Sequence, residues 1–311
     1  MLINLFEELA WHEFVKLPDM QGKTLNEQVA YYKQYLSDLD QARQSLINYQ
    51  NKGVSIQTSS ETPGDPVSCN QGMDVVFLID NTGSMASAIN GVKSSIASIV
   101  QTIITESGGD YRLGLTIFDE YGNTTPSSNY SNAPAYTGLP ASQRYININN
   151  TAGVSQYITA VEMMSVANQL SFQAQLNLLN DAVNGISLGH GNGAPEPGGM
   201  AVDLIQQGFN GAFRSGVAKL VILITDNQPG GDDDLYNALD GAFLTQVAAN
   251  CLADNIQVLV LTSRTAAFPG TEYYILSDGT NGSYTISNTL APADIQTEIE
   301  NICDSNANPA T

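Results

Sequence analysis

The sequence predicts an α/β protein: an open, mostly parallel central sheet with helices on both faces, preceded by a helical N-terminal arm. From residue 71 onward, short apolar runs alternate with amphipathic helical stretches. This alternation is typical of parallel strands joined by helices. The runs are apolar at nearly every position, as expected of strands buried on both faces. Residues 1–53 instead carry the only tryptophan and one long helical pattern. The predicted class is therefore a Rossmann-like α/β domain behind a helical arm.

The arm, residues 1–53, is predicted to attach or oligomerise. Thr24–Glu27 fits a capping box, and Gly53 fits a helix stop. Between them, apolar side chains recur every seven residues, at Leu25, Tyr32, Leu39 and Leu46. A helix of about 40 Å is unstable in water without a partner surface. We therefore expect residues 24–53 to pack on their own domain, to form a homo-oligomer, or to dock onto a larger assembly.

The remaining elements follow in order along the chain. Residues 54–70 are rich in Ser, Thr, Pro and Gly without periodicity, which predicts a linker. Residues 71–303 form the predicted domain, and residues 304–311 a C-terminal tail. Strands are expected at 74–79, 112–118, 220–225 and 256–262, and helices at 86–105 and 235–253. Residues 120–151 are rich in Asn, Ser, Thr and Tyr and are predicted to form a long surface excursion.

Charge and composition exclude several classes of partner. The 311 residues carry a net charge of −20, which opposes binding to nucleic acid or to an anionic membrane. No run approaches the roughly 18 apolar residues of a membrane span, and the N-terminus lacks a basic segment. We therefore expect no membrane insertion and no signal peptide. Abundant Asn, Ser, Thr, Gly and Tyr are typical of exposed surfaces, so a virion surface is the expected location, with extracellular and cytoplasmic locations as alternatives.

The three cysteines cannot all pair within one chain. Cys69 precedes the first predicted strand, and Cys303 ends the last predicted helix. A bond between them would join the two ends of the domain in an oxidising compartment, whereas both stay reduced in a reducing one. Cys251 lies in an apolar helical segment and is predicted to be buried and free.

The candidate site begins where the first strand ends. Asp80, Thr82 and Ser84 follow the apolar run 75–79 directly, and a strand-to-helix turn can aim residues i, i+2 and i+4 at one point. Hard cations such as magnesium, manganese and calcium prefer these oxygen ligands. The run 219–225 is likewise followed directly by Asp226, before a glycine-rich turn. Because open parallel sheets bind ligands at the carboxyl ends of their strands, we expect both aspartates at one edge.

These residues resemble the von Willebrand factor type A domain. Its metal-ion-dependent adhesion site begins Asp-x-Ser-x-Ser, with Thr82 here replacing the first serine, and includes an aspartate after the fourth strand. The run 191–199, with Glu196, is similar to the Pro-Glu-Gly-Gly loop of integrin β I-like domains, whose glutamate contacts the metal. The resemblance covers residues 71–303 and implies one divalent cation, Mg²⁺ with Mn²⁺ or Ca²⁺ as alternatives. The implied ligands are Asp80, Thr82, Ser84, Glu196 and Asp226.

The resemblance also implies a function. An open position on the cation would accept an Asp or Glu carboxylate from a partner protein, giving non-enzymatic, metal-bridged adhesion. Integrin β subunits carry acids for an adjacent cation soon after the serines, but this chain has Ala86, Ser87 and Ala88. Gly193 likewise stands where an aspartate is common. We therefore expect a single metal.

Other functions are weighed against adhesion. Phosphotransfer from Asp80 resembles haloacid dehalogenase chemistry, but the required second aspartate is Thr82. Hydrolysis has only His12 and His190 to draw on and no nucleophile elbow. The five site residues of a degenerate domain would merely cap helices and satisfy turns, and Asp232–Asp234 are expected to be capping charges.

Adhesion at a virion surface is the preferred setting, because the arm, the expected lack of an export signal and the surface-like composition fit a bacteriophage particle. The first 53 residues also loosely resemble attachment segments of phage structural proteins. An intracellular scaffold or co-chaperone-type protein is one alternative. A particle-decorating protein whose metal only stabilises the fold is the other.

Overall fold

The computed structural model describes residues 23–26, 28, 67–121, 145–149, 154–163, 168–181, 183, 185–189, 195–230, 238–262, 272–286 and 292–307. The predicted arm lies outside the described residues, apart from five positions, residues 23–26 and 28. There the Gln28 N–H donates to the Thr24 carbonyl at 2.9 Å, one helical bond at the predicted cap. Linker residues 54–66, most of the excursion at 120–151 and tail residues 308–311 also lie outside.

The described strands form one seven-stranded sheet in the order β3-β4-β2-β1-β5-β6-β7. β1, β2, β5, β6 and β7 run parallel, while β4 pairs antiparallel with both β2 and β3. The strand bounds are Met73–Asp80 for β1, Tyr111–Tyr121 for β2, Tyr145–Asn149 for β3, Val154–Val161 for β4, Ala218–Thr225 for β5, Ile256–Thr262 for β6 and Ser283–Ile286 for β7. The predicted mostly parallel α/β sheet is therefore confirmed.

Helices connect these strands and flank the sheet. The 3-10 turns are η2 at Cys69–Gln71 and η3 at Gly83–Met85. The α-helices are α3 at Ala86–Glu106, α5 at Gln169–Leu176, α6 at Gly198–Gln206, α7 at Ala238–Ala253, α8 at Glu272–Asp278 and α9 at Pro292–Ala307. Among the described residues, no helix is long and apolar enough to cross a membrane.

Three boundaries differ from the prediction. β3 and β4 pair as an antiparallel ladder, so the end of the predicted excursion at 120–151 belongs to the sheet. The predicted linker ends before residue 70, because η2 is already packed into the domain. The predicted tail begins too early, because α9 continues to Ala307. In the last two cases, residues of polar composition belong to the domain because they form helical turns that contact it.

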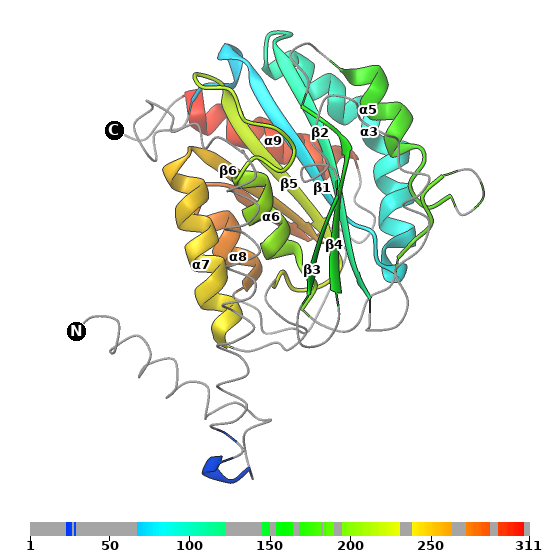
Figure 1. The fold of residues 1–311 in the computed structure, drawn as a ribbon. Helices are drawn as coiled ribbons and strands as arrows, with labels where there is room; N and C mark the ends of the chain where they lie inside the picture. Colours follow the sequence, from blue (N-terminus) through cyan, green and yellow to red (C-terminus); the bar gives the residue numbers. More distant parts are fainter. Residues whose placement is uncertain are drawn as a thin grey trace.

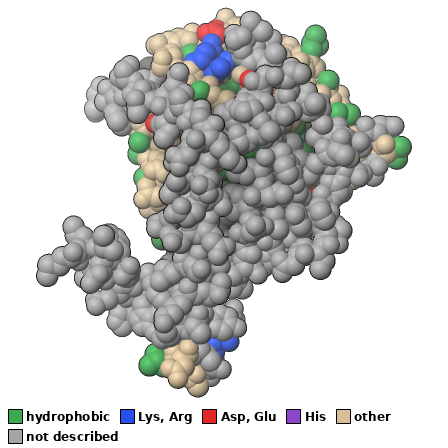
Figure 2. Space-filling view, in the orientation of Figure 1, with side chains coloured by type: hydrophobic (Ala, Val, Ile, Leu, Met, Phe, Trp, Pro, Cys, Tyr) green, Lys and Arg blue, Asp and Glu red, His purple; other side chains and the backbone are tan. Residues whose placement is uncertain are grey.

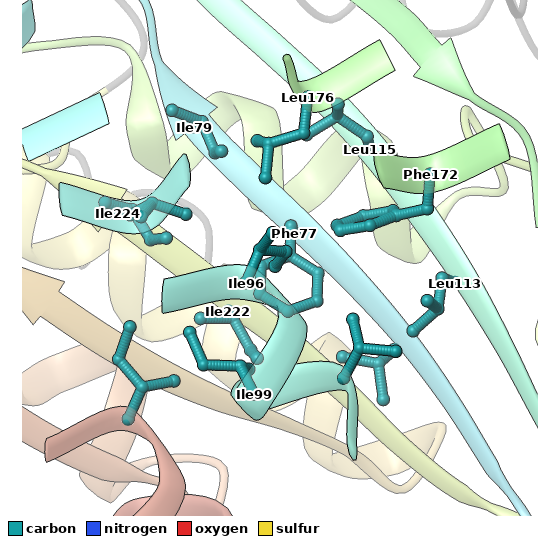
Figure 3. Packing of buried hydrophobic residues seen from close by; sticks show 14 of the residues in the cluster. Phe77, Ile79, Ile96, Ile99, Leu113, Leu115, Phe172, Leu176, Ile222 and Ile224 are labelled. Atoms are coloured by element: carbon teal, nitrogen blue, oxygen red, sulfur yellow. The ribbon is translucent and has the colours of Figure 1, made fainter. Parts of the chain in front are cut away.

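Helices cover both faces of the sheet (Figure 1). Because successive side chains of a strand point to opposite faces, β1 contributes to two separate cores. Val75, Phe77 and Ile79 pack with α3, α5 and α9, whereas Val76 and Leu78 pack with α6, α7 and α8. Figure 3 shows the first core, where isoleucines of α3 lie over Phe77. The Phe77 and Phe172 ring centroids are 4.9 Å apart. This burial on both faces holds β1 rigidly.

At the end of the sheet where the parallel strands begin, a buried cluster of charged side chains joins neighbouring strands. Asp74 is fully buried and accepts hydrogen bonds from Nε of Arg112 at 2.8 Å and from Nε of Arg214 at 2.9 Å. The backbone N–H of Arg214 donates to the other Asp74 oxygen at 2.7 Å, and its guanidinium also pairs with Asp110. Basic and acidic side chains lie together at the top of the face in Figure 2. Two of the scarce basic residues are thus used to join β1, β2 and the approach to β5.

A disulfide closes the same edge. Cys69 and Cys303 are bonded, which settles the pairing that the sequence left open. Beside it, Nδ2 of Asn306 in α9 donates to the Val67 carbonyl at 3.2 Å and to Oε1 of Gln257 at 2.7 Å. Cys251 is free and buried, as predicted, and burial raises the pKa of its thiol. The start and the end of the domain are therefore joined covalently and by hydrogen bonds.

Breaking the disulfide should lower the free energy of unfolding by about 3–5 kcal/mol, because the bond restricts a loop with a sequence separation of 234 residues in the unfolded chain. Urea titrations of the wild type with and without reductant would measure the loss. A Cys69→Ser, Cys303→Ser double variant should show the same loss and no response to reductant. Three titratable thiols in the unreduced, denatured wild type would contradict the bridge.

Candidate metal centre

The turn from β1 to α3 brings the first three predicted ligands together. Asp80 is the last residue of β1 and is fully buried. The Thr82 N–H donates to Oδ1 of Asp80 at 2.8 Å, and the hydroxyls of Thr82 and Ser84 lie 3.3 Å apart. Ser84 is exposed, whereas Thr82 is buried. One carboxylate and two hydroxyls therefore share this turn, as the spacing predicts.

β5 supplies a contact that sequence reasoning missed. Ile79 of β1 lies opposite Ile224 of β5, and one position further Thr225 lies beside Asp80. The Thr225 hydroxyl donates to Oδ2 of Asp80 at 2.9 Å. Both Asp80 oxygens are thus fixed by hydrogen bonds from threonines. The available signal was a hydroxyl residue at the matching end of the second strand.

The electrostatics of Asp80 are unfavourable for an ionised carboxylate. Burial, with a smaller contribution from the negative charge of Asp226, raises its pKa from 3.8 to about 7, against the lowering effect of the bonds from Thr82 and Thr225. In the described part of the chain, the salt bridges involve only Asp74 and Asp110, at the opposite edge. Asp80 therefore lies close enough to Asp226 for repulsion, and no salt bridge among the described residues compensates this charge.

Glu196 is docked by its backbone onto the segment that follows Asp226. Its N–H donates to the Gln228 carbonyl at 2.8 Å, and its carbonyl accepts the Gly230 N–H at 2.7 Å. A Cβ atom on Gly230 would lie 2.4 Å from Cγ of Pro195, and one on Gly199 would lie 2.6 Å from the Gly230 oxygen. The glycines are needed because the two segments touch through their backbones. Glu196 itself is 3% exposed.

The five predicted residues are therefore joined to different degrees. Asp80, Thr82 and Ser84 form one hydrogen-bonded turn. Asp226 interacts with Asp80 through its charge. The backbone of Glu196 is hydrogen-bonded to that of Gln228, two residues after Asp226. Among the described residues, no group of three or more His, Cys, Asp or Glu side chains is placed to hold a metal ion. The donor set that converges is thus one carboxylate with hydroxyls, and the three predicted acids do not form a single cluster.

Other polar residues at this edge also escaped the sequence analysis. β2 extends past the predicted Phe118 and includes Asp119, a fully buried acid near the end of this strand, which pairs with β1. Asn81 and Gln228 are fully buried as well. The oxygen of the Asn81 amide and both polar atoms of the Gln228 amide have no hydrogen-bond partner in the part of the chain that the structure describes. Buried polar atoms of this kind are uncommon and mark functional sites or bound solvent and ions.

His190, residues 191–194 of the predicted loop and Asp232–Asp234 lie outside the described residues.

No family model matches the chain, and no curated protein does either. Similar solved structures include the VWA domain of SpRpn10, at 9% identity and a TM-score of 0.42, covering 74% of this chain and 94% of that one. Manganese-loaded Plasmodium vivax TRAP matches at 14% identity and a TM-score of 0.43, covering 76% of this chain and 74% of that one. The pilus adhesin SpaC from Lactobacillus rhamnosus GG matches at 16% identity and a TM-score of 0.45, covering 80% of this chain but only 34% of that one.

The chain has the α/β sheet described above, and one of the matched structures is a VWA domain, which is the type of domain that the sequence resembles. Each of these TM-scores is below 0.5, and the evidence on function lies in the residues of the site.

Proposed function

We propose that the chain is a non-enzymatic, cation-dependent protein-binding module. One divalent cation at the carboxyl end of β1 would bridge to an Asp or Glu carboxylate of a partner protein. The observation that carries the proposal is Asp80, a fully buried carboxylate that two threonines orient and that lies near the charge of Asp226 without a basic partner among the described residues. A hard cation offsets this unfavourable charge and accepts the same oxygen ligands.

The proposed roles follow from where the side-chain oxygens lie and from which side chains are exposed. Asp80, Thr82 and Ser84 would hold the cation directly, because their oxygens share one turn. Asp226 and Glu196 would act through bound water or at a longer distance, which agrees with the lack of a three-acid cluster among the described residues. Mg²⁺ fits best, because it usually keeps several waters and needs few carboxylates. When bound, the cation supplies a position for a partner carboxylate, and the exposure of Ser84 leaves this side accessible.

Binding is favoured over catalysis by the same contacts. Both oxygens of Asp80 accept hydrogen bonds from Thr82 and Thr225, so the carboxylate is fixed rather than free to attack a phosphoryl group. Position 82, where phosphotransfer requires an acid, carries a hydroxyl.

The disulfide bears on the setting. A bond between Cys69 and Cys303 favours an oxidising environment, such as an extracellular or particle surface, over the intracellular scaffold. The virion surface is our preferred setting on the grounds of composition, and attachment through residues 24–53 belongs to the same proposal.

Added Mg²⁺ or Mn²⁺ should stabilise the wild type, by about 2.7 kcal/mol at a hundredfold excess over the Kd. Asp80→Asn and Ser84→Ala should lose most of this effect, since each removes a direct ligand. Thermal unfolding in EDTA and in added metal would measure it. Ser94→Ala is the matched control, because Ser94 is an exposed serine of α3 whose hydroxyl donates to the Gly91 carbonyl of the same helix. Equal stabilisation of Asp80→Asn and the wild type would contradict the site.

The cation affinity should fall about tenfold per pH unit below pH 7, because protons compete for Asp80, whose pKa is raised to about 7. In the absence of metal, a rise in pH has the opposite effect: it lowers the contribution of Asp80 to the stability of the fold. The folded state binds this proton more tightly than the unfolded chain, so the contribution of Asp80 to stability is complete below pH 3.8 and is lost as the pH rises through about 7. Calorimetric titration with Mn²⁺ from pH 5.5 to 8 would measure the first effect, and a flat profile would refute it. Asp80→Asn should lack the second effect.

Capture of partner proteins by the full chain should require the cation. Mg²⁺ should support capture and EDTA should abolish it, while Asp80→Ala and Glu196→Ala should capture little in either condition, because the bridge to the partner carboxylate is lost. Undiminished capture in EDTA would rule out the metal bridge. Metal-dependent stability combined with metal-independent capture would instead support the purely structural alternative.

A further inference from the structure

Asn81, between Asp80 and Thr82, ties the β1–α3 turn to two other parts of the domain. Its N–H donates to the Phe118 carbonyl of β2 at 2.7 Å. Its carbonyl accepts the Gly189 N–H at 2.7 Å, and its Nδ2 donates to the Ser187 carbonyl at 3.1 Å. With both main-chain groups and the side-chain donor bonded, this single residue fixes the turn from two sides.

The segment on the far side of these bonds is itself held firmly. The Ile186 N–H donates to the Leu178 carbonyl at 2.7 Å, and the Ile186 side chain is fully buried in the core under α3 and α5. A Cβ atom on Gly83 would lie 3.7 Å from the Gly189 oxygen, so the segment also passes close to the turn. Asn81 is therefore anchored to a part of the core rather than to a loose loop.

The position of Asn81 makes its orientation matter for the ligands. The Thr82 N–H that donates to Asp80 belongs to the peptide group joining Asn81 to Thr82. Rotation of that peptide would move this N–H and the Thr82 hydroxyl relative to Asp80, and with them Ser84, whose hydroxyl lies against that of Thr82. The bonds of Asn81 to Phe118, Ser187 and Gly189 restrict this rotation.

Stability alone does not account for an asparagine here. Asn81 is fully buried, and its Oδ1 has no hydrogen-bond partner in the described part of the chain. An unsatisfied buried acceptor costs about 1–3 kcal/mol. In the described part of the chain, the Asn81 amide thus leaves its Oδ1 unsatisfied and bonds only through Nδ2. Such a cost in stability is expected where a residue serves the geometry of a site.

We propose that Asn81 is a positioning residue of the cation site, which holds Thr82 and Ser84 in place by anchoring the β1–α3 turn to Ser187 and Gly189. The proposal rests on the proposed function. Asn81 does not contact the cation and acts through the residues on either side of it. Loss of its amide should leave the direct ligands present but less well oriented, and changes of this kind usually lower metal affinity about 10- to 100-fold.

The test is Mn²⁺ binding by the full chain at constant pH, compared among the wild type, Asn81→Ala and Asn306→Ala. Asn306 is a matched control, because it is a buried asparagine at the opposite edge whose Nδ2 also donates to a backbone carbonyl and whose Oδ1 also has no partner in the described part of the chain. Both variants should lower the melting temperature in EDTA. Only Asn81→Ala should raise the Kd for Mn²⁺, by about tenfold or more.

The outcomes distinguish the positioning role of Asn81 from the existence of the cation site itself. If the wild type binds Mn²⁺ and Asn81→Ala binds it within twofold of the wild type, the positioning role is wrong while the cation site stands. An equal loss in Asn306→Ala would also overturn it, because affinity would then follow stability alone. A wild type that does not bind Mn²⁺ would overturn the proposed function, and the positioning role with it.

A second measurement uses the wild type alone and so does not depend on the folding of a variant. Hydrogen exchange with and without Mg²⁺ should show that the cation increases protection of the Gly189 N–H together with that of the Thr82 N–H, because Asn81 links the two. Increased protection of Thr82 with no change at Gly189 would overturn the proposal.

Discussion

The parallel pairing of β1 with β2 on one side and β5 on the other is the constraint on which the rest of the structure depends. β1 is buried along its whole length and contributes to the cores on both faces of the sheet. Its neighbours come from opposite directions of the strand order, so the sheet has a topological switch point at the end of β1. In open α/β sheets this is where a crevice forms and ligands bind. Asp80 ends the strand at that point, and the register with β5 places Thr225 beside it.

The two edges of the sheet differ in their chemistry. At the edge where the parallel strands begin, Arg112 and Arg214 neutralise the buried Asp74, and the Cys69–Cys303 disulfide joins the two ends of the domain. At the opposite edge, Asp80 is buried near Asp226 without a basic partner among the described residues. Since the chain has only 11 basic residues against 31 acidic ones, using two of them at the first edge accentuates this contrast. Stabilising interactions are thus concentrated away from the edge that carries unbalanced negative charge.

Much of the fold followed from hydrophobic pattern. The four strands predicted from apolar runs all lie in the sheet, and α3 begins at the predicted residue and ends one residue later. β3, β4 and β7 were not predicted as strands, because β3 and β4 mix polar with apolar residues and β7 has only four residues. Strands at or near an edge need less continuous apolar sequence than a central strand. The expected free and buried Cys251 followed from its apolar helical context.

By itself, the sequence determined the α/β class and the ligand types at the end of β1, because burial on both faces and the spacing of Asp80, Thr82 and Ser84 are local properties of the chain. The tertiary structure alone decided which distant groups meet them. Thr225 lies 145 residues from Asp80, and Ser187 lies 106 residues from Asn81. Such contacts depend on strand order, register and the backbone approach of the glycines near Glu196, none of which is encoded in local pattern. For the same reason the sequence predicted five converging ligands, whereas the described structure joins three in one turn and holds the other two acids at its margin.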